Sequence, residues 1–388
     1  MGGRFPDGFV WGTATAAHQV EGGNWNNDWW AWEHAPGSPC VEPSGDACDH
    51  HHRYPDDLAL LAELGFCSYR FSVEWSRIEP EDGEFSVAAL DHYDRVTDTC
   101  LGLGLDPVVT LHHFTNPRWV AAGGGWIEPV TAERFGRFAE RVAARLGDRV
   151  SRFCTINEPN IVATIGYLVG VFPPGEHDPD LRAGAGEVLA AGHRRAVEAV
   201  RAVSTARVGL TMALPDWVAV DGGDETMEAL RGPDEDVFLE ATSGDDFIGV
   251  QTYTRNRVGP AGVLGPEDGV ETTLMGYEFW PEALEGAIRR AYEITGLPVL
   301  VTENGMATTD DTRRIEYVRR ALKGVLRCLD DAIPVEGYTY WSALDNFEWA
   351  LGYGPAFGLI AVDRSTQERT VKPSARWLGE VARRNVLS

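Results

Sequence analysis

The chain has 388 residues, of which 44% are hydrophobic, so it is long enough to bury a large core. Its 34 basic and 59 acidic side chains give a formal net charge of −25 at pH 7. A surface this acidic repels nucleic acid and anionic membranes and disfavours phosphorylated substrates. The simplest expected partner is therefore a neutral small molecule.

The first residues carry no targeting signal or anchor of a standard kind. Residues 1–7 lack the apolar stretch of a secretory signal, and the chain contains no apolar run of about 18 residues that could span a bilayer. We therefore expect a cytoplasmic protein that does not cross a membrane. No low-complexity tract or composition shift marks a linker, so we predict one domain over residues 1–388.

The cysteines and a histidine run give little support for a metal site. The six cysteines are scattered without a C-x-x-C pair, which favours buried thiols over disulfides or zinc ligands. His50, His51 and His52 are consecutive, so on a helix they would point in different directions, and they lack evident partner ligands elsewhere in the chain. We expect no metal and no other cofactor.

Short runs typical of strands alternate with segments of helical spacing. Residues 56–65 predict a helix that leads into a strand, because Asp56 and Asp57 open the segment and Gly65 occupies the position after its last turn. The alternation predicts an α/β fold with a single (β/α)₈ barrel of the TIM type rather than a doubly wound sheet. The predicted strands are residues 9–15, 67–72, 107–112, 153–157, 207–213, 247–251, 298–302 and 337–341.

Two glutamates follow or close strands of this predicted barrel. Barrel enzymes carry their chemistry on the loops after the strands, and Glu158 and Glu303 lie at the ends of strands 4 and 7, near-opposite across the barrel mouth. Cleavage of a glycosidic bond needs one carboxyl group to protonate the leaving oxygen and a second to attack the sugar or activate water. The pair therefore predicts glycoside hydrolysis, and two unrelated surface ion pairs are the alternative.

Each glutamate lies within a short sequence motif, and further motifs are spread along the chain. Residues 155–159 read TINEP and residues 301–305 read VTENG, and further motifs are FPDGFVWG at 5–12, QVEG at 19–22, YRFS at 69–72 and WSALDNFEW at 341–349. Together they resemble glycoside hydrolase family 1, the β-glucosidase and β-galactosidase family. The resemblance covers nearly the whole chain.

The resemblance implies a retaining β-glycosidase in which Glu158 is the acid/base and Glu303 the nucleophile that forms a glycosyl-enzyme intermediate. Asn157 would donate to the sugar 2-hydroxyl, Arg70 would lie near the nucleophile, and Tyr253 would hydrogen-bond it. A cation and a donor beside Glu303 favour its ionised form, while Glu158 must stay protonated near neutral pH. The alternatives are a structural ion pair for Arg70 and a half-buried aromatic residue for Tyr253.

The same resemblance implies a site for one non-reducing sugar. A glutamine and a carboxylate can each bridge two neighbouring hydroxyls, and an indole face packs against C–H groups. The matching residues are Gln19, His113, Glu348 and Trp349, with Trp341 as the platform under the ring. Trp341 has core packing as its alternative. His112 is expected to be structural, because strand alternation points it away from His113.

Glu348 also bears on the substrate. Relatives that act on 6-phospho-sugars replace residues 348–349 and add a basic residue shortly after, where this chain has GPA at 354–356. A phosphate beside Glu348 would be repelled, so phosphorylated substrates are disfavoured. We expect hydrolysis of terminal β-D-glucosides, with β-galactosides and β-fucosides left open.

Other positions depart from the family pattern. Phe114, Thr115 and the pair at 251–252 replace a common Trp, Asp and Asn-Tyr, and the chain looks several tens of residues short between Pro215 and Asp246. These departures concern specificity and the leaving-group side more than catalysis. A transglycosylase using the same intermediate and a catalytically silent sugar-binding protein are the alternative functions. We make no prediction of oligomeric state.

Overall fold

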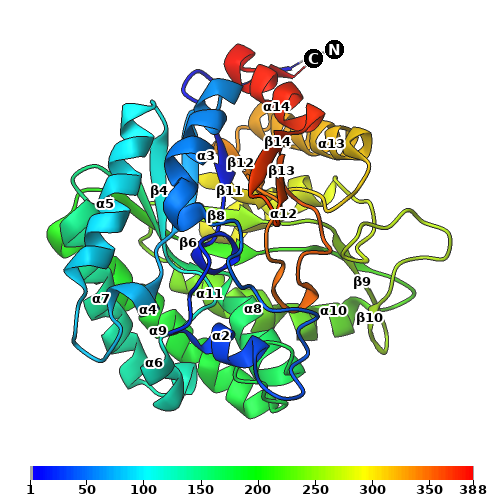
Figure 1. The fold of residues 1–388 in the computed structure, drawn as a ribbon. Helices are drawn as coiled ribbons and strands as arrows, with labels where there is room; N and C mark the ends of the chain where they lie inside the picture. The colour runs from blue at the N-terminus through cyan, green and yellow to red at the C-terminus, as the bar shows by residue number, and fades with distance from the viewer. Residues whose placement is uncertain (1–2, 388) are drawn as a thin grey trace.

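A closed barrel of eight parallel strands forms the centre of the computed structural model, which describes residues 3–387 (Figure 1). The strand order around the barrel is β2-β3-β4-β5-β6-β8-β11-β12, and β12 closes the ring by pairing with β2. These strands are β2 (Val10–Ala14), β3 (Ser68–Ser72), β4 (Asp106–His112), β5 (Arg152–Asn157), β6 (Arg207–Ala213), β8 (Phe247–Gln251), β11 (Val299–Asn304) and β12 (Val335–Trp341). Each lies within one residue or two of a predicted strand, so the predicted (β/α)₈ barrel is confirmed.

Long helices surround the barrel and cover its outer face (Figure 1). They are α3 (His50–Leu64), α5 (Val87–Gly102), α7 (Val130–Leu146), α9 (Pro179–Val203), α12 (Ala283–Thr295), α13 (Asp311–Asp330) and α14 (Pro373–Arg384). Each buries an apolar stripe against the strands, as in α7, where Phe135, Phe138 and Val142 are fully buried. No helix within residues 3–387 is long and apolar enough to cross a bilayer.

Shorter helices lie in the connections. The α-helical ones are α1 (Ala17–Val20), α2 (Asp28–Glu33), α4 (Trp75–Ile78), α6 (Arg118–Ala122), α8 (Pro159–Thr164), α10 (Asp224–Arg231) and α11 (Val237–Ala241). The others are the 3₁₀ turns η1 (Gly125–Ile127) and η4 (Trp349–Leu351) and the π-helical turns η2 (Ile165–Val169) and η3 (Gly232–Asp236).

Three small sheets add to the barrel. A ribbon of β1 (Gly3–Arg4) and β15 (Val386–Leu387) joins the two ends of the described chain, and β13 (Ile360–Asp363) pairs with β14 (Glu368–Val371). The third sheet is β7 (Asp216–Ala219), β9 (Arg255–Gly259) and β10 (Gly262–Leu264). Because β7 and β9 follow barrel strands β6 and β8 directly, this sheet extends the barrel at its C-terminal end.

Helix α3 begins earlier than the sequence analysis predicts. It begins at His50, so Asp56 and Asp57 lie inside the helix rather than in its first turn. Asp57 is buried there and accepts hydrogen bonds from His50 and Arg369, which explains its place within the helix. Gly65 ends the helix as predicted, in the left-handed conformation with φ of 102° that glycine adopts without strain.

The ends of β11 and β12 approach each other closely at Gly305. A Cβ atom on this residue would lie 2.0 Å from the carbonyl oxygen of Trp341, so no other residue fits without a backbone shift. The glycine of the VTENG motif thereby brings the segment after Glu303 against the last residue of β12. The peptide bond between Trp341 and Ser342 is cis.

Candidate active site

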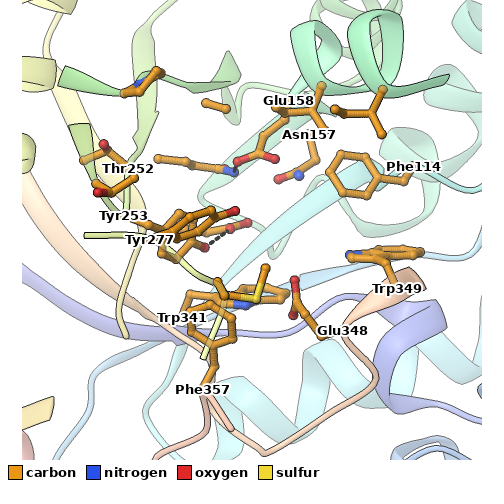
Figure 2. Close-up of a pocket in the computed structure, with 18 of the residues that line it drawn as sticks. Phe114, Asn157, Glu158, Thr252, Tyr253, Tyr277, Trp341, Glu348, Trp349 and Phe357 are labelled. Atoms are coloured by element: carbon orange, nitrogen blue, oxygen red, sulfur yellow. Dashed lines mark hydrogen bonds between the residues drawn. The ribbon is translucent and has the colours of Figure 1, made fainter. Parts of the chain in front are cut away.

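A cavity of about 510 Å³ opens at the C-terminal ends of the barrel strands. All of the predicted site residues line it except Gln19 and Arg70, which lie directly behind the lining. Figure 2 shows Glu158 and Asn157 on one side of this cavity, with Trp341 and Glu348 on the opposite side. The strand-end residues singled out from the sequence therefore do meet in one place.

Glu303 is held by a donor on each of its carboxylate oxygens. Arg70 Nη1 donates to Oε1 at 2.6 Å, and the Tyr253 hydroxyl donates to Oε2 at 2.7 Å. The Arg70 and Glu303 side chains are both almost fully buried, so this ion pair is screened little by solvent. Tyr253 is itself positioned from behind, because Tyr317 donates to its carbonyl oxygen at 2.7 Å.

Arg70 also orients Asn157. Its Nη2 donates to Asn157 Oδ1 at 2.6 Å, which leaves the amide nitrogen as the free end of that side chain. Asn157 Nδ2 is buried and has no hydrogen-bond partner among the described residues. A buried donor of this kind is costly unless something accepts from it, so Asn157 is prepared to donate to a hydroxyl in the cavity.

Glu158 has a different environment. It follows β5 with φ of 46°, a left-handed conformation that is rare for a residue with a side chain, and Pro159 then begins α8. Its only side-chain donor among the described residues is Gln251, whose Nε2 lies 2.7 Å from Glu158 Oε1. Gln251 is fixed in turn by the Thr302 hydroxyl, which donates to its Oε1 at 3.1 Å.

The different hydrogen-bond donors have different effects on the pKa values of the two carboxyl groups. The pKa of Glu158 is raised to about 8, because burial and the charge of Glu303 both raise it, while the Gln251 hydrogen bond opposes them. Burial also raises the pKa of Glu303, but there the Arg70 cation and the Tyr253 hydroxyl act in the opposite direction. Arg70 and Tyr253 thus oppose the rise in the pKa of Glu303, although desolvation outweighs them. Because Arg70 forms an ion pair with Glu303 and hydrogen-bonds no atom of Glu158, this asymmetry favours an ionised Glu303 beside a protonated Glu158.

The opposite side of the cavity carries polar and aromatic groups. Gln19 donates to the carbonyl oxygen of Phe347 at 2.8 Å and to Glu348 at 3.4 Å, while its Oε1 is buried without a partner among the described residues. The His113 ring lies nearly parallel to Trp341 and Trp349, with interplanar angles of 18° and 14°. Burial lowers the pKa of His113 well below its ordinary value, so its imidazole is neutral.

These residues match a known enzyme family. The sequence model described as "Glycosyl hydrolase family 1" matches residues 1–236 and 250–387. The chain belongs to glycosyl hydrolase family 1. Its barrel, its two buried glutamates and the motifs around them are therefore those of an O-glycosyl hydrolase.

Family 1 relatives align with the chain over almost its full length. The crystal structure of beta-glycosidase BGL167 is 50% identical, with a TM-score of 0.93 over 98% of this chain and 97% of that one. The thermostable beta-glucosidase B of Thermobispora bispora is 36% identical over 99% of this chain and 91% of that protein. The bifunctional beta-D-glucosidase/beta-D-fucosidase of Bifidobacterium breve is 35% identical over 96% of this chain and 97% of that protein.

The chain is shorter than the Thermobispora and Bifidobacterium relatives. Its alignment with the Thermobispora protein spans 439 positions, against the 388 residues present here. The match to the family model is interrupted between residues 236 and 250, at the end of the segment after β6 that looked short in the sequence. That segment holds only β7, α10, η3 and α11 before β8 begins.

One side-chain cluster outside the cavity has atoms close enough to bind a metal. The ligand atoms of Glu21, His51 and His92 lie within 4.8 Å of one another, so His51 does have distant partners that the sequence did not reveal. However, Arg77 Nε already donates to Glu21 Oε2 at 2.9 Å. A second cation on that carboxylate would be repelled, so the cluster carries no metal assignment.

Gln251 is the site residue whose role the sequence analysis missed. The pair at 251–252 departs from the family pattern in a way that indicates altered specificity, yet Gln251 contacts Glu158 directly. Its place at the end of a barrel strand was the available signal. His112 lies outside the cavity lining, as alternation predicts, and its Nε2 donates to Asn116 Oδ1 at 3.1 Å.

Proposed function

We propose that this family 1 enzyme hydrolyses terminal non-reducing β-D-glucosides with retention of configuration, with Glu303 as nucleophile and Glu158 as acid/base. The observation that carries the proposal is the asymmetry between the two carboxyl groups. Glu303 is paired with Arg70 at 2.6 Å and Tyr253 at 2.7 Å, whereas Glu158 has the neutral donor Gln251. One group is thereby suited to attack and the other to give a proton.

In the first step Glu303 attacks the anomeric carbon while Glu158 protonates the leaving oxygen. The bond from C1 to the leaving group breaks, and an ester bond forms between C1 and a carboxylate oxygen of Glu303. Positive charge develops at C1 on the way, and a hydrogen bond from Asn157 Nδ2 to the 2-hydroxyl strengthens as that charge grows. Such an interaction is stronger in the transition state than in the ground state, so it raises the rate.

In the second step Glu158, now a carboxylate, accepts a proton from water as the water attacks C1. The ester to Glu303 breaks and β-glucose leaves, so two inversions give net retention. Arg70 and Tyr253 stabilise the departing carboxylate. The same step with an alcohol in place of water would give transglycosylation. No contact among the described residues of the cavity favours that reaction over hydrolysis.

The sugar would lie against Trp341, with its hydroxyls held by Gln19, His113, Glu348 and Trp349. The unpartnered Gln19 Oε1 supports this arrangement, because a sugar hydroxyl would satisfy it. No Lys or Arg side chain lines the cavity within residues 3–387, which disfavours a phosphorylated sugar. The Bifidobacterium relative, named for glucosidase and fucosidase activities, supports β-fucosides as additional substrates.

The test is a screen of p-nitrophenyl glycosides that varies both sugar and anomer, followed by ¹H NMR of the first product formed. β-Glucoside should be cleaved fastest, and β-glucose should appear before mutarotation produces the α anomer. Initial release of α-glucose would contradict retention, and a lack of cleavage of every β-glycoside would contradict the proposal.

The expected location in the cytoplasm stays a prediction, tested by cell fractionation.

A further inference from the structure

The two halves of the cavity differ in their chemistry. The sugar half is polar, but the segments that follow β5 and β6 contribute almost only hydrocarbon. We call this surface the apolar wall, and it consists of Ile161, Ile165, Val171, Phe172, Leu214 and Pro215. Phe114 extends it towards the sugar half, since its ring lies 5.5 Å from that of Phe172.

The apolar wall lies beside the proposed proton donor. Ile161 is one turn beyond Glu158 in α8, and its N–H donates to the Glu158 carbonyl oxygen at 3.0 Å. Leu214 and Pro215 follow β6, the strand next to β5. Because the acid must reach the oxygen of the leaving group, the leaving group occupies the part of the cavity that this wall bounds.

The apolar wall offers few hydrogen bonds to a ligand. Its side chains carry no donor or acceptor, and its backbone is largely in use: the Val171 carbonyl accepts from Trp32 at 3.1 Å, and the N–H groups of Val171 and Leu214 donate within the protein. A second sugar ring has hydroxyls around its whole edge. Those that face the wall would lose water without gaining a partner, which is costly.

Polar groups are confined to the facing side. In Figure 2, Thr252 and Tyr277 lie on one side of the cavity and Phe114 on the other. The Thr254 hydroxyl is already used, since it donates to the Glu278 carbonyl oxygen at 3.0 Å. The leaving-group half can therefore satisfy a ligand that is polar along one edge at most.

The apolar surface continues beyond the cavity. Leu351 lines the cavity and is 44% exposed, and Val169, at the end of the same π-helical turn as Ile165, is also 44% exposed. Exposed aliphatic side chains at a cavity mouth extend the area over which an apolar ligand can be buried. A chain longer than the cavity itself would still find contacts here.

We propose that the leaving-group half of this cavity binds alkyl and aryl aglycones in preference to a second sugar. The inference rests on the proposed function, because it assumes cleavage of β-glucosides at Glu158 and Glu303. It names the class of leaving group for this chain: a hydrocarbon body on the glycosidic oxygen, packed against the apolar wall.

The test uses n-alkyl β-D-glucosides from ethyl to hexyl, kept below their micelle concentrations, with cellobiose for comparison. The acidity of the leaving alcohol is nearly constant along this series, so changes in kcat/KM report contacts with the wall. Burial of methylene groups should raise kcat/KM roughly two- to fourfold for each one added. Hexyl glucoside should also exceed cellobiose. A flat series, or cellobiose above hexyl glucoside, would overturn the inference.

Matched variants locate the effect. Ile165→Asn should reduce the hexyl-to-ethyl ratio of kcat/KM at least threefold, on the order of one methylene contact. Ile294→Asn makes the same chemical change at a 38% exposed position near the end of α12, at the opposite end of the barrel, and should keep the wild-type ratio. A ratio is independent of the fraction of active enzyme. Equal ratios in the two variants would contradict the assignment of the wall.

β-D-Glucosyl fluoride separates the two proposals, because its leaving group makes no contact with the wall. Cleavage of the fluoride together with a flat alkyl series would overturn the aglycone inference alone. Failure to cleave the fluoride and every alkyl glucoside would instead overturn the proposed function.

Discussion

Gln251 donates a hydrogen bond to Glu158 Oε1 at 2.7 Å, and the Thr302 hydroxyl fixes which end of the amide faces that carboxyl group. Gln251 is fully buried, so its amide cannot exchange this contact for water. A donor favours the ionised carboxylate, and Gln251 thus restrains the rise in the pKa of Glu158 that burial causes. It is a positioning residue for the proposed acid/base.

Replacement of Gln251 by Leu should therefore shift the basic limb of the pH profile of kcat/KM to higher pH. Without the donor the pKa of Glu158 rises above about 8, so the acid stays protonated to higher pH. A neutral hydrogen bond contributes about 0.5–1.5 kcal/mol, which corresponds to a shift of up to about one pH unit. Thr302→Val should shift the limb less in the same direction. A limb that stays in place, or moves down, would contradict the role of Gln251.

Glu303→Ala should remove hydrolysis of all β-glucosides, activated ones included. Without the carboxylate the glycosyl-enzyme ester cannot form, so neither of the two steps can proceed. In other enzymes, removal of the nucleophile lowers the rate roughly 10⁴-fold or more. The rate with 2,4-dinitrophenyl β-glucoside is the measurement, with circular dichroism to verify folding. Residual cleavage within about tenfold of wild type would exclude Glu303 as the nucleophile.

Glu158→Ala should discriminate between leaving groups. Alkyl glucosides need a proton on the leaving oxygen and should slow by about 10²–10⁴-fold, whereas 2,4-dinitrophenolate leaves without one and its release should change far less. The comparison is kcat/KM for the two substrates with one enzyme preparation, so misfolding cannot mimic it. Equal losses on both would count against an acid role.

Arg70→Met should raise the pKa of Glu303, because the opposing cation is removed while burial remains. The nucleophile must be ionised, so the acid limb of kcat/KM should move to higher pH. Breaking a buried ion pair from one side also lowers the free energy of unfolding by about 3–5 kcal/mol, measured by urea denaturation. Arg70→Lys keeps the charge without the fork that also reaches Asn157, so its acid limb should move less. An acid limb that does not move in Arg70→Met would show that Arg70 does not tune Glu303.

The barrel and its strand-end residues could be predicted because their signals are local. Each strand shows as a short apolar run, and Glu158 and Glu303 lie within motifs of five residues that fix their place at a strand end. The burial of Asp57 inside α3 could not be predicted, since its partner Arg369 lies 312 residues further along the chain. Local periodicity carries no information about such a partner.

The same limit applies within the site. Gln251 and Glu158 are 93 residues apart, and their contact depends on the barrel bringing β5 and β8 towards one cavity. The apolar wall was equally out of reach, because Ile161 and Ile165 read as ordinary helix residues until α8 and its π-helical extension are placed beside Leu214. Two expectations stay predictions: that residues 1–388 form a single domain, and that each site residue has the role expected of it.

Glu348→Gln should stabilise the protein while it impairs sugar binding. Burial raises the pKa of Glu348 to about 8 from an ordinary value of 4.5, so the folded state binds more protons than the unfolded state between these two pH values. Folded stability therefore falls as pH rises from about 4.5 to 8, and a glutamine, which cannot ionise, escapes this loss. The gain in the free energy of unfolding should be on the order of 1–3 kcal/mol at pH 7 and near zero at pH 4.5, measured by urea denaturation at both. A gain that is equal at the two pH values would show that ionisation of Glu348 is not its cause.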